Sequence, residues 1–475
     1  MARINTNVSA LTAQRGLAQS QKTLSQTLER LSSGLRINRG KDDPAGLIAS
    51  ETLRSEISGI NQAIDNSSRA SNVIATAEGA LSEVANLLLN IKDLVVEAAN
   101  TGALSPEEIK ANQLQVDSAV ESITRISNTT SFAGLKLING SMDYITSGVA
   151  TSAISSLHIN QANFATNASI PVEVSVITSA KTADLEFRSA TITSSLTLEI
   201  SGNEGVETLQ FVSGTAASAI AFAVNRVTDA TGVAAAYIDP TDPTQGVMLQ
   251  SADYGSKSFV TVSALKGTFD TVDSVGNAKS RSEGVDAVAT INGALTVGDG
   301  RNIKLNSSSL DLELTIGETF GAGSTSFAIT GGGALFQLGP QVKSNQQVNI
   351  SIQSVGASKL GESEIGFLTD LVTGGSATLE GDASAASRIV EKAIKQIAVL
   401  RGRLGAFEKN TLDTNVNSLS IALENVTASQ SQIRDADFAK ETAELTRAQI
   451  LTQAGTSVLA TANSTPQQVL SLLGR

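Results

Sequence analysis

The sequence predicts an α+β multidomain protein in which both chain ends form a long antiparallel helical coiled-coil rod, with a mainly-β outer region inserted between them. Three observations support this fold class: an apolar repeat near the C-terminus, a matching repeat near the N-terminus, and a central stretch that alternates apolar and polar residues. Because the two repeats lie in opposite terminal thirds, we expect the long helices that they predict to lie side by side.

The C-terminal repeat spans residues 386–433 and contains no proline. Its apolar residues recur at alternating steps of four and three as far as Phe407, and after a polar break the pattern resumes one step out of phase at Leu412. Asp382 stands just ahead as a helix N-cap. At the α-helical rise, one helix over this range would be roughly 75 Å long. Such a helix needs a partner along most of its length, because helix propensity alone stabilises it little.

The matching N-terminal repeat runs from Ile57 to Ala98. We expect its helix to begin at Pro44, since Asp43 is a favourable N-cap and proline is favoured at the first helical position. The same helix should end near Asn100, just before a glycine.

A third helix is predicted next, and after it the sequence pattern changes from helical to strand-like. Ser105 and Glu108 have the spacing of a capping box, which predicts a helix that ends near Asn128. The run at residues 135–138, followed by Asn139-Gly140, predicts a strand and a turn.

From about residue 170 to 355 the chain is rich in Ser, Thr, Gly and Val, and period-two runs predict half-buried antiparallel strands. These runs occupy residues 172–176, 196–200, 310–316 and 348–352. One short helix is expected over residues 216–227. Gly331-Gly332-Gly333 is interpreted as a linker that returns to the helical rod.

Each end of the chain carries a narrow apolar stripe on a seven-residue grid. The grid consists of Leu17, Leu24 and Leu31 in a first segment (residues 4–35) and of Phe438, Leu445 and Leu459 in a last one. We expect both segments to be marginal as single helices. Pro466 is expected to interrupt the last segment.

Composition excludes several classes of function. The chain has no Cys, and its one His, His158, is expected at the surface. Thiolate sites, His-based catalytic triads and multi-His metal sites are therefore excluded, while carboxylate chemistry stays open on composition. Because no motif supports catalysis, we expect no catalytic, metal-binding or cofactor-binding residues. The net charge of −12, with no basic block to offset it, disfavours nucleic acid. The sequence contains no run of eighteen apolar residues, so no membrane span is predicted. The N-terminus lacks the apolar core of a signal peptide.

One acidic motif resembles the start of a calcium loop, Asp435-x-Asp437, but the glycine and glutamate of such a loop are missing at its sixth and twelfth positions. A turn or helix cap is the better interpretation. Capping likewise explains the carboxylate pair Asp42-Asp43.

The terminal thirds resemble bacterial flagellin. The matching N-terminal stretches are residues 31–38 (LSSGLRIN), 42–47 (DDPAGL) and 76–81 (TAEGAL). The matching C-terminal stretches are residues 403–406 (RLGA), 424–427 (ENVT), 433–437 (IRDAD), 449–455 (QILTQAG) and 466–470 (PQQVL). Residues 196–236 resemble a repeat shared by hook proteins and some flagellin outer domains.

This resemblance implies a structural subunit that self-assembles into the helical flagellar filament for motility. Residues 1–42 and 435–475 would form the filament inner core, residues 43–165 and 334–434 a helical rod domain with a β-hairpin, and residues 166–333 the outer, surface-exposed part. The protein would be extracellular, exported without a cleaved signal peptide by the flagellar type III pathway. Implied partners are further copies of the chain, an export chaperone with the export apparatus, and hook-associated junction and cap proteins.

The resemblance also bears on the flagellin-sensing Toll-like receptor of animals. In receptor-active flagellins an Arg and a Leu one helical turn apart, with a Glu on the next helix, carry the contact. The matching positions here are Asn90, Leu94 and Gln115, of which only Leu94 agrees. The resemblance therefore implies a poor or altered ligand, although the same residues could simply suit packing inside the filament.

Three alternative functions are considered beside the filament subunit. A hook–filament junction protein shares the terminal pattern, and abundance on sheared flagella would distinguish the two. A filament subunit whose outer domain also acts as an adhesin or ligand is compatible with the first function. An enzyme would follow the flagellins that carry an inserted protease, but the chain has no zinc-binding helix motif.

Overall fold

The computed structural model describes residues 6–165, 167–307 and 309–473, which fall into two compact units. The first unit holds the described residues up to Arg69, residues 337–342 and those from Asn410 onward. The second holds the described part of 70–336 together with 343–409. The described chain ends therefore belong to one unit, although they are far apart in the sequence.

Long helices occupy both terminal thirds, as the apolar repeats predict. They are α1 (Val8–Ser33), α2 (Pro44–Ala98), α3 (Pro106–Thr129), α6 (Ala383–Phe407), α7 (Thr414–Arg434) and α8 (Phe438–Leu473). Three predicted helix starts are confirmed by their caps. Asp382 caps α6, since its Oδ1 accepts from the Ala385 N–H at 2.9 Å. Asp43 Oδ1 accepts from the Gly46 N–H at 2.9 Å, and Ser105 and Glu108 form a reciprocal capping box.

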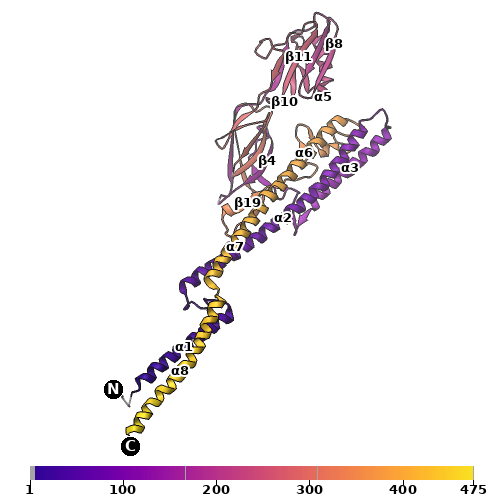
Figure 1. Ribbon diagram of the computed structural model, residues 1–475. Coiled ribbons are helices and arrows are strands. Elements are labelled where there is room, and N and C mark those ends of the chain that lie inside the picture. The colour runs from indigo at the N-terminus through magenta and orange to yellow at the C-terminus, as the bar shows by residue number, and fades with distance from the viewer. Residues whose placement is uncertain (1–5, 166, 308, 474–475) are drawn as a thin grey trace. The chain divides into compact units, whose positions relative to one another are not determined.

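In the first unit α1 and α8 lie side by side (Figure 1). A backbone bridge joins Leu35, just after α1, to Asp435, just before α8. Asp437 caps α8, with its Oδ1 accepting from the Ala439 N–H at 2.9 Å. The Asp435-x-Asp437 motif is thus a turn and a helix cap, as expected.

The expectation of one regular helix over residues 386–433 is wrong in one respect. A six-residue π-helix, η4 (Glu408–Asp413), separates α6 from α7. It coincides with the five-residue step from Phe407 to Leu412, where the apolar repeat slips. Because a π-turn holds one residue more than an α-turn, it offsets that slip, and Leu412 is only 1% exposed.

In the second unit α2 and α6 run antiparallel and carry the predicted apolar stripes. Lys92 pairs with Glu391 and Arg401 with Glu78, each at 3.0 Å. The stripes are buried at Leu81, Leu88, Ile91 and Val95 of α2, at Val116, Val120 and Ile123 of α3, and at Val390, Ile397, Leu400 and Leu404 of α6. These aliphatic side chains supply the main favourable term in the packing of the helices.

Two five-stranded sheets share one hydrophobic core and form the first β body. Their strand orders are β14-β13-β5-β17-β3 and β15-β16-β4-β19-β18. The strands are β3 (Tyr144–Ser147), β4 (Ile154–Ala162), β5 (Ile170–Thr178), β13 (Val288–Ile291), β14 (Ala294–Val297), β15 (Asn302–Asn306), β16 (Leu310–Ile316), β17 (Gly323–Gly332), β18 (Ala334–Gln337) and β19 (Gln347–Ile350). Three of the four predicted strand runs lie here.

A second β body has its own core and contains the fourth predicted run. Its sheets have the orders β6-β10-β9 and β12-β11-β7-β8. The elements are β6 (Thr182–Phe187), β7 (Leu196–Ser201), β8 (Val206–Phe211), α4 (Ala217–Asn225), α5 (Thr228–Thr231), β9 (Val233–Tyr237), η1 (Pro243–Gln245), β10 (Val247–Tyr254), β11 (Phe259–Lys266) and β12 (Arg281–Glu283). The short helix expected at residues 216–227 is therefore confirmed as α4.

Arg403 connects α6 to the first β body. Its guanidinium donates to the Asn160 side chain and, at 3.0 Å, to the Ser351 carbonyl oxygen. Burial lowers the pKa of this guanidinium.

The turn predicted at Asn139-Gly140 does not form a hairpin with the strand before it. The strand at Leu135–Lys136 (β2) pairs backward with β1 (Ser131–Phe132), not forward across Asn139-Gly140. Ala133 and Gly134 make the tight connection, and both have positive φ, which suits a two-residue hairpin. The remaining short elements are η2 (Ser344–Gln346), β20 (Gly361–Glu362), β21 (Gly366–Phe367) and η3 (Leu368–Leu371).

The linker expected at Gly331-Gly332-Gly333 is also wrong. Gly331 and Gly332 end β17 and pair with β3. A Cβ on Gly332 would lie 2.2 Å from the Asp143 carbonyl oxygen. The glycines are therefore needed for close backbone approach within a sheet, and flexibility does not explain them.

Pro466 does not interrupt the last helix, because α8 continues through it to Leu473. Proline removes one backbone donor but permits a helix when another group bonds the carbonyl that it leaves.

Gly246→Ala should destabilise the second β body. Gly246 has φ +111°, and a Cβ there would lie 2.0 Å from the Phe187 carbonyl oxygen. Gly214→Ala is a matched control with φ +85° and nothing within 4 Å of the added Cβ. Backbone strain alone should cost about 1–2 kcal/mol in the control, and the clash should add to that cost at Gly246. Calorimetry would compare the two, and equal losses would contradict the steric argument.

Candidate interaction surface

The contacts between α1 and α8 run in opposite directions along the two helices, so the pair is antiparallel. Contacts link Asn7 to Ala462, Leu17 to Gly455, and Arg30 to Glu441. Gly455 lets α1 approach closely, because a Cβ built there would lie 3.3 Å from Leu17 Cδ1.

The structure places five of the six grid residues in partly covered positions. Leu17, Leu24 and Leu31 on α1, and Leu445 and Leu459 on α8, are half-buried. Phe438 differs, since its side chain is 70% exposed. The α1/α8 pair alone therefore covers the grid only in part.

The pair buries little and exposes much apolar surface. Thr27 is the buried side chain of α1, and Glu441 and Ala448 are those of the described part of α8. The large apolar side chains that remain exposed are Val8, Leu11, Leu28, Phe438, Ile450, Leu451 and Val458. We call these seven the exposed terminal apolar set. Exposed apolar side chains on two neighbouring helices make this pair the candidate interaction surface.

One ion pair sits inside the helix pair. Arg30 Nη1 lies 3.2 Å from Glu441 Oε1, and the Glu441 side chain is 8% exposed. Arg30 is in the last turn of α1 and Glu441 in the first turn of α8, so each charge complements its own helix dipole.

The receptor-equivalent positions lie on neighbouring turns of α2 and on α3. Asn90 and Gln115 are exposed and Leu94 is half-buried. Gln115 Nε2 lies 3.4 Å from Asn112 Oδ1, so its amide faces its own helix. The described hydrogen bonds and ion pairs include none that joins Asn90, Leu94 and Gln115.

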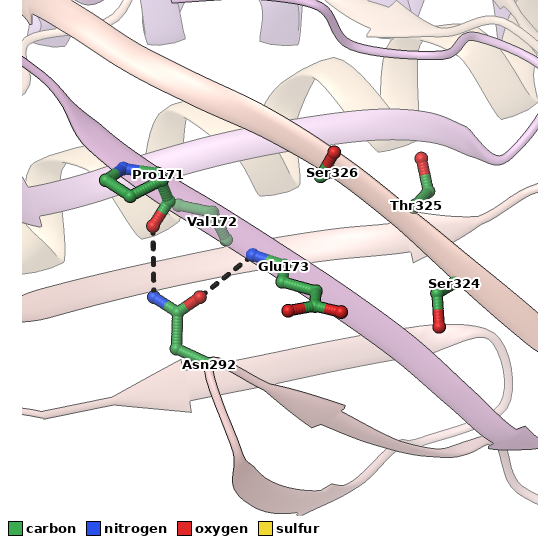
Figure 2. Close-up of a pocket in the computed structure, with 7 residues that line it drawn as sticks. All are labelled: Pro171, Val172, Glu173, Asn292, Ser324, Thr325 and Ser326. Atoms are coloured by element: carbon green, nitrogen blue, oxygen red, sulfur yellow. Dashed lines mark hydrogen bonds between the residues drawn. The ribbon is translucent and has the colours of Figure 1, made fainter.

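A hollow of about 470 Å³ lies over β5 and β17 (Figure 2). Asn292 is already engaged there, since its Oδ1 accepts from the Glu173 N–H at 2.8 Å and its Nδ2 donates to the Pro171 carbonyl at 3.3 Å. Glu173 is the one ionisable residue of the lining. The hollow thus lacks the convergent polar groups of a binding site.

His158 is half-buried on β4, which corrects the expected surface position. Its Nε2 lies 3.1 Å from Ser156 Oγ, and burial lowers the pKa of the imidazole. Among the described residues no group of His, Asp and Glu could hold a metal ion. In the same residues, no helix is long and apolar enough to cross a membrane.

Sequence reasoning missed two residues of the helix pair, Asn7 and Glu441. Asn7 could have been found as a favourable N-cap ahead of α1. Glu441 carries no such signal, because its burial depends on the position of α1.

Paired terminal helices with exposed apolar side chains, and a β-rich segment between them in sequence, are typical of a structural subunit and not of an enzyme or a ligand-binding domain. Comparisons with known proteins agree. The models for the bacterial flagellin N-terminal and C-terminal helical regions match residues 4–143 and 387–473, and that for the flagellin hook IN motif matches residues 197–253. The last match overlaps the stretch expected to resemble a hook-protein repeat.

Relatives match over the full length. The chain is 31% identical to a B-type flagellin of Pseudomonas aeruginosa, 30% to polar flagellin C of Vibrio parahaemolyticus and 28% to a flagellin of Salmonella typhimurium, covering 99% of both chains each time. The chain belongs to the bacterial flagellin family, and it is a structural subunit of the flagellar filament.

Solved structures resemble the chain only weakly. A flagellar cap protein fragment from Escherichia coli aligns at 17% identity and a TM-score of 0.28, covering 39% of this chain and 97% of that one. FliC from Burkholderia pseudomallei aligns at 14% identity and a TM-score of 0.25, covering 72% and 99%.

Arg30→Ala should weaken the α1/α8 pair, because it leaves the Glu441 carboxylate buried without its cation. A stranded buried polar group costs about 1–3 kcal/mol, and more when charged. The double variant Arg30→Ala/Glu441→Gln removes the charge and should recover most of the loss. Heat dissociation of filaments followed by circular dichroism would measure both. An equal loss in the two variants would contradict a role for the buried charge.

Proposed function

We propose that α1 and α8 form the inner core of the filament by packing the exposed terminal apolar set against the same helices of neighbouring subunits. The observation that carries this proposal is the contrast within the pair, which buries Ala448 but leaves Phe438 and Ile450 largely exposed. A contact between different patches of identical subunits generates a helical polymer whenever its rotation does not close into a ring. Burial of apolar surface would drive its growth.

The grid residues would complete this packing as a coiled coil. Leu17, Leu24, Leu31, Phe438, Leu445 and Leu459 are the proposed core residues. Their partial exposure in the single chain supports the proposal. A side chain that one partner helix covers only in part can still pack between four side chains of a second helix, as in a coiled coil.

We also propose the three-part division of the chain expected from the sequence. Residues 1–42 and 435–475 would be the inner core, 43–165 and 334–434 a coiled-coil rod domain, and 166–333 the outer surface. The ion pairs and buried stripes between α2 and α6 support the rod. The outer boundary would be functional only, because β4 and β19 share the sandwich core with strands of 166–333.

We also propose an export route and a set of partners for this chain. The chain would pass unfolded through the flagellar type III pathway with an export chaperone and meet junction and cap proteins at the filament end. A chain without Cys has no disulfide to reduce before such passage. We propose no enzymatic role.

Phe438→Asp/Ile450→Asp should abolish filament growth while leaving the single chain folded. Both side chains are largely exposed, at 70% and 64%, so the carboxylates would cost little until a neighbour covers them. A carboxylate at the first residue of α8 would even suit the helix dipole. Sedimentation after seeding with filament fragments is the test.

Phe222→Asp/Leu295→Asp is a matched control, because these side chains in the β bodies are 68% and 66% exposed. It should leave filament yield unchanged. If both double variants polymerise normally, the terminal helices do not carry the contact. If both fail, added charge alone explains the result.

We further propose that the chain is a weak ligand for the animal receptor that senses flagellin. Asn90 is exposed but lacks the guanidinium of an arginine, with its positive charge and multiple donors. Gln115 is exposed but lacks a carboxylate. Asn90→Arg/Gln115→Glu should raise receptor activation by monomer, since charge-assisted hydrogen bonds are roughly twice as strong as neutral ones.

A receptor reporter assay would compare wild type, the double variant and Leu94→Ala in the double-variant background. The last change should cancel the gain if half-buried Leu94 shares the contact. Full potency of the wild type, with no gain in the double variant, would show that these positions do not govern recognition.

A further inference from the structure

Asn7 ties the start of α1 to the C-terminal half of α8. Its Nδ2 donates to the Ala462 carbonyl oxygen at 2.7 Å, while its Oδ1 accepts from the Ala10 N–H at 3.0 Å as the N-cap of α1. One side chain thus serves two helices, since its oxygen bonds α1 and its amino group bonds α8.

The Ala462 carbonyl differs from its neighbours in α8 because of Pro466. In an α-helix a carbonyl accepts from the N–H four residues further on. Pro466 occupies that position for Ala462 and has no N–H. Asn7 supplies a donor to this carbonyl from the neighbouring helix, so the carbonyl keeps a hydrogen bond although α8 continues through a proline.

We propose that Asn7 is a positioning residue that sets the register of α1 on α8 by donating to the carbonyl that Pro466 deprives of its helical donor. Pro466 is the single proline of α8. If α1 slid by one turn, Asn7 would face a carbonyl whose usual helical donor is present, and the bond would be lost. The link to assembly rests on the proposed function, because register decides which apolar side chains face a neighbouring subunit.

A double-variant cycle tests this proposal in filaments. Asn7→Asp keeps a side-chain oxygen for the Ala10 N–H but loses the donor to Ala462. We expect it to raise the concentration of unpolymerised subunit at equilibrium by about fivefold, the ratio carried by one hydrogen bond of ordinary net strength. Pro466→Ala restores a backbone N–H to the helix. In that background Asn7→Asp should raise the same concentration by less than about twofold.

A cross-link reports the register directly. A Cβ on Gly455 would lie 3.5 Å from Leu17 Cβ, which is within the Cβ spacing of a disulfide, and the chain has no Cys to compete. In filaments of Leu17→Cys/Gly455→Cys, Asn7→Asp should slow cross-linking, and Pro466→Ala should restore the rate. Gln14→Glu is the control, because it places the same added charge at an exposed site of α1.

Equal effects of Asn7→Asp in both backgrounds would overturn the proposal, and so would cross-linking rates equal to those of Gln14→Glu. If Pro466→Ala prevents polymerisation, the second comparison still decides the matter in the original background. If Phe438→Asp/Ile450→Asp forms normal filaments while the cross-link still depends on Asn7, the register contact stands and the proposed core role fails.

Discussion

Neither α1 nor α8 finds enough neighbouring surface within the chain to cover its apolar side chains. An amphipathic helix is stable when its apolar stripe is covered, and a two-helix pair covers only the seam between its members. The α1/α8 pair buries Ala448 yet leaves Phe438 exposed. By contrast, α2, α3 and α6 each bury a continuous apolar stripe, although single side chains outside the stripes, such as Leu114 and Val399, stay exposed. The chain therefore has helices that cover their main apolar stripes within the chain, and a terminal pair that would complete its packing with other subunits in the proposed filament core.

Polar contacts fix the register of the α1/α8 pair, which the apolar contacts alone would leave open. Leucines on a seven-residue grid would tolerate a slide of one heptad, because each knob would find an equivalent hole. The Arg30–Glu441 pair at one end and the Asn7–Ala462 bond at the other have no equivalent after such a slide. Single polar contacts are known to specify register in this way at some cost in stability.

Helix positions and strand runs were predictable because they depend on local periodicity. The caps at Asp43 and Ser105 and the runs in β5, β7 and β16 needed only neighbours in sequence. Pro466 was misjudged because its compensating donor, Asn7, is far away in sequence. The return linker at Gly331 was misjudged because a glycine that permits close backbone approach looks the same in sequence as a flexible one. The half-coverage of Leu17 and Leu459, and the burial of Glu441, depend on how two distant helices pack.

The two β bodies are nested, and nesting has an evolutionary consequence. The chain leaves the sandwich after β5, builds the second body from β6 to β12, and re-enters the sandwich at β13. Lys181 and Val285 form a backbone bridge where the outgoing and returning segments meet, with both hydrogen bonds at 2.8–2.9 Å. A module whose two ends meet at one point can be lost, replaced or lengthened by recombination without stretching its host. An exchange of the second body at this junction would leave every strand connection of the sandwich in place.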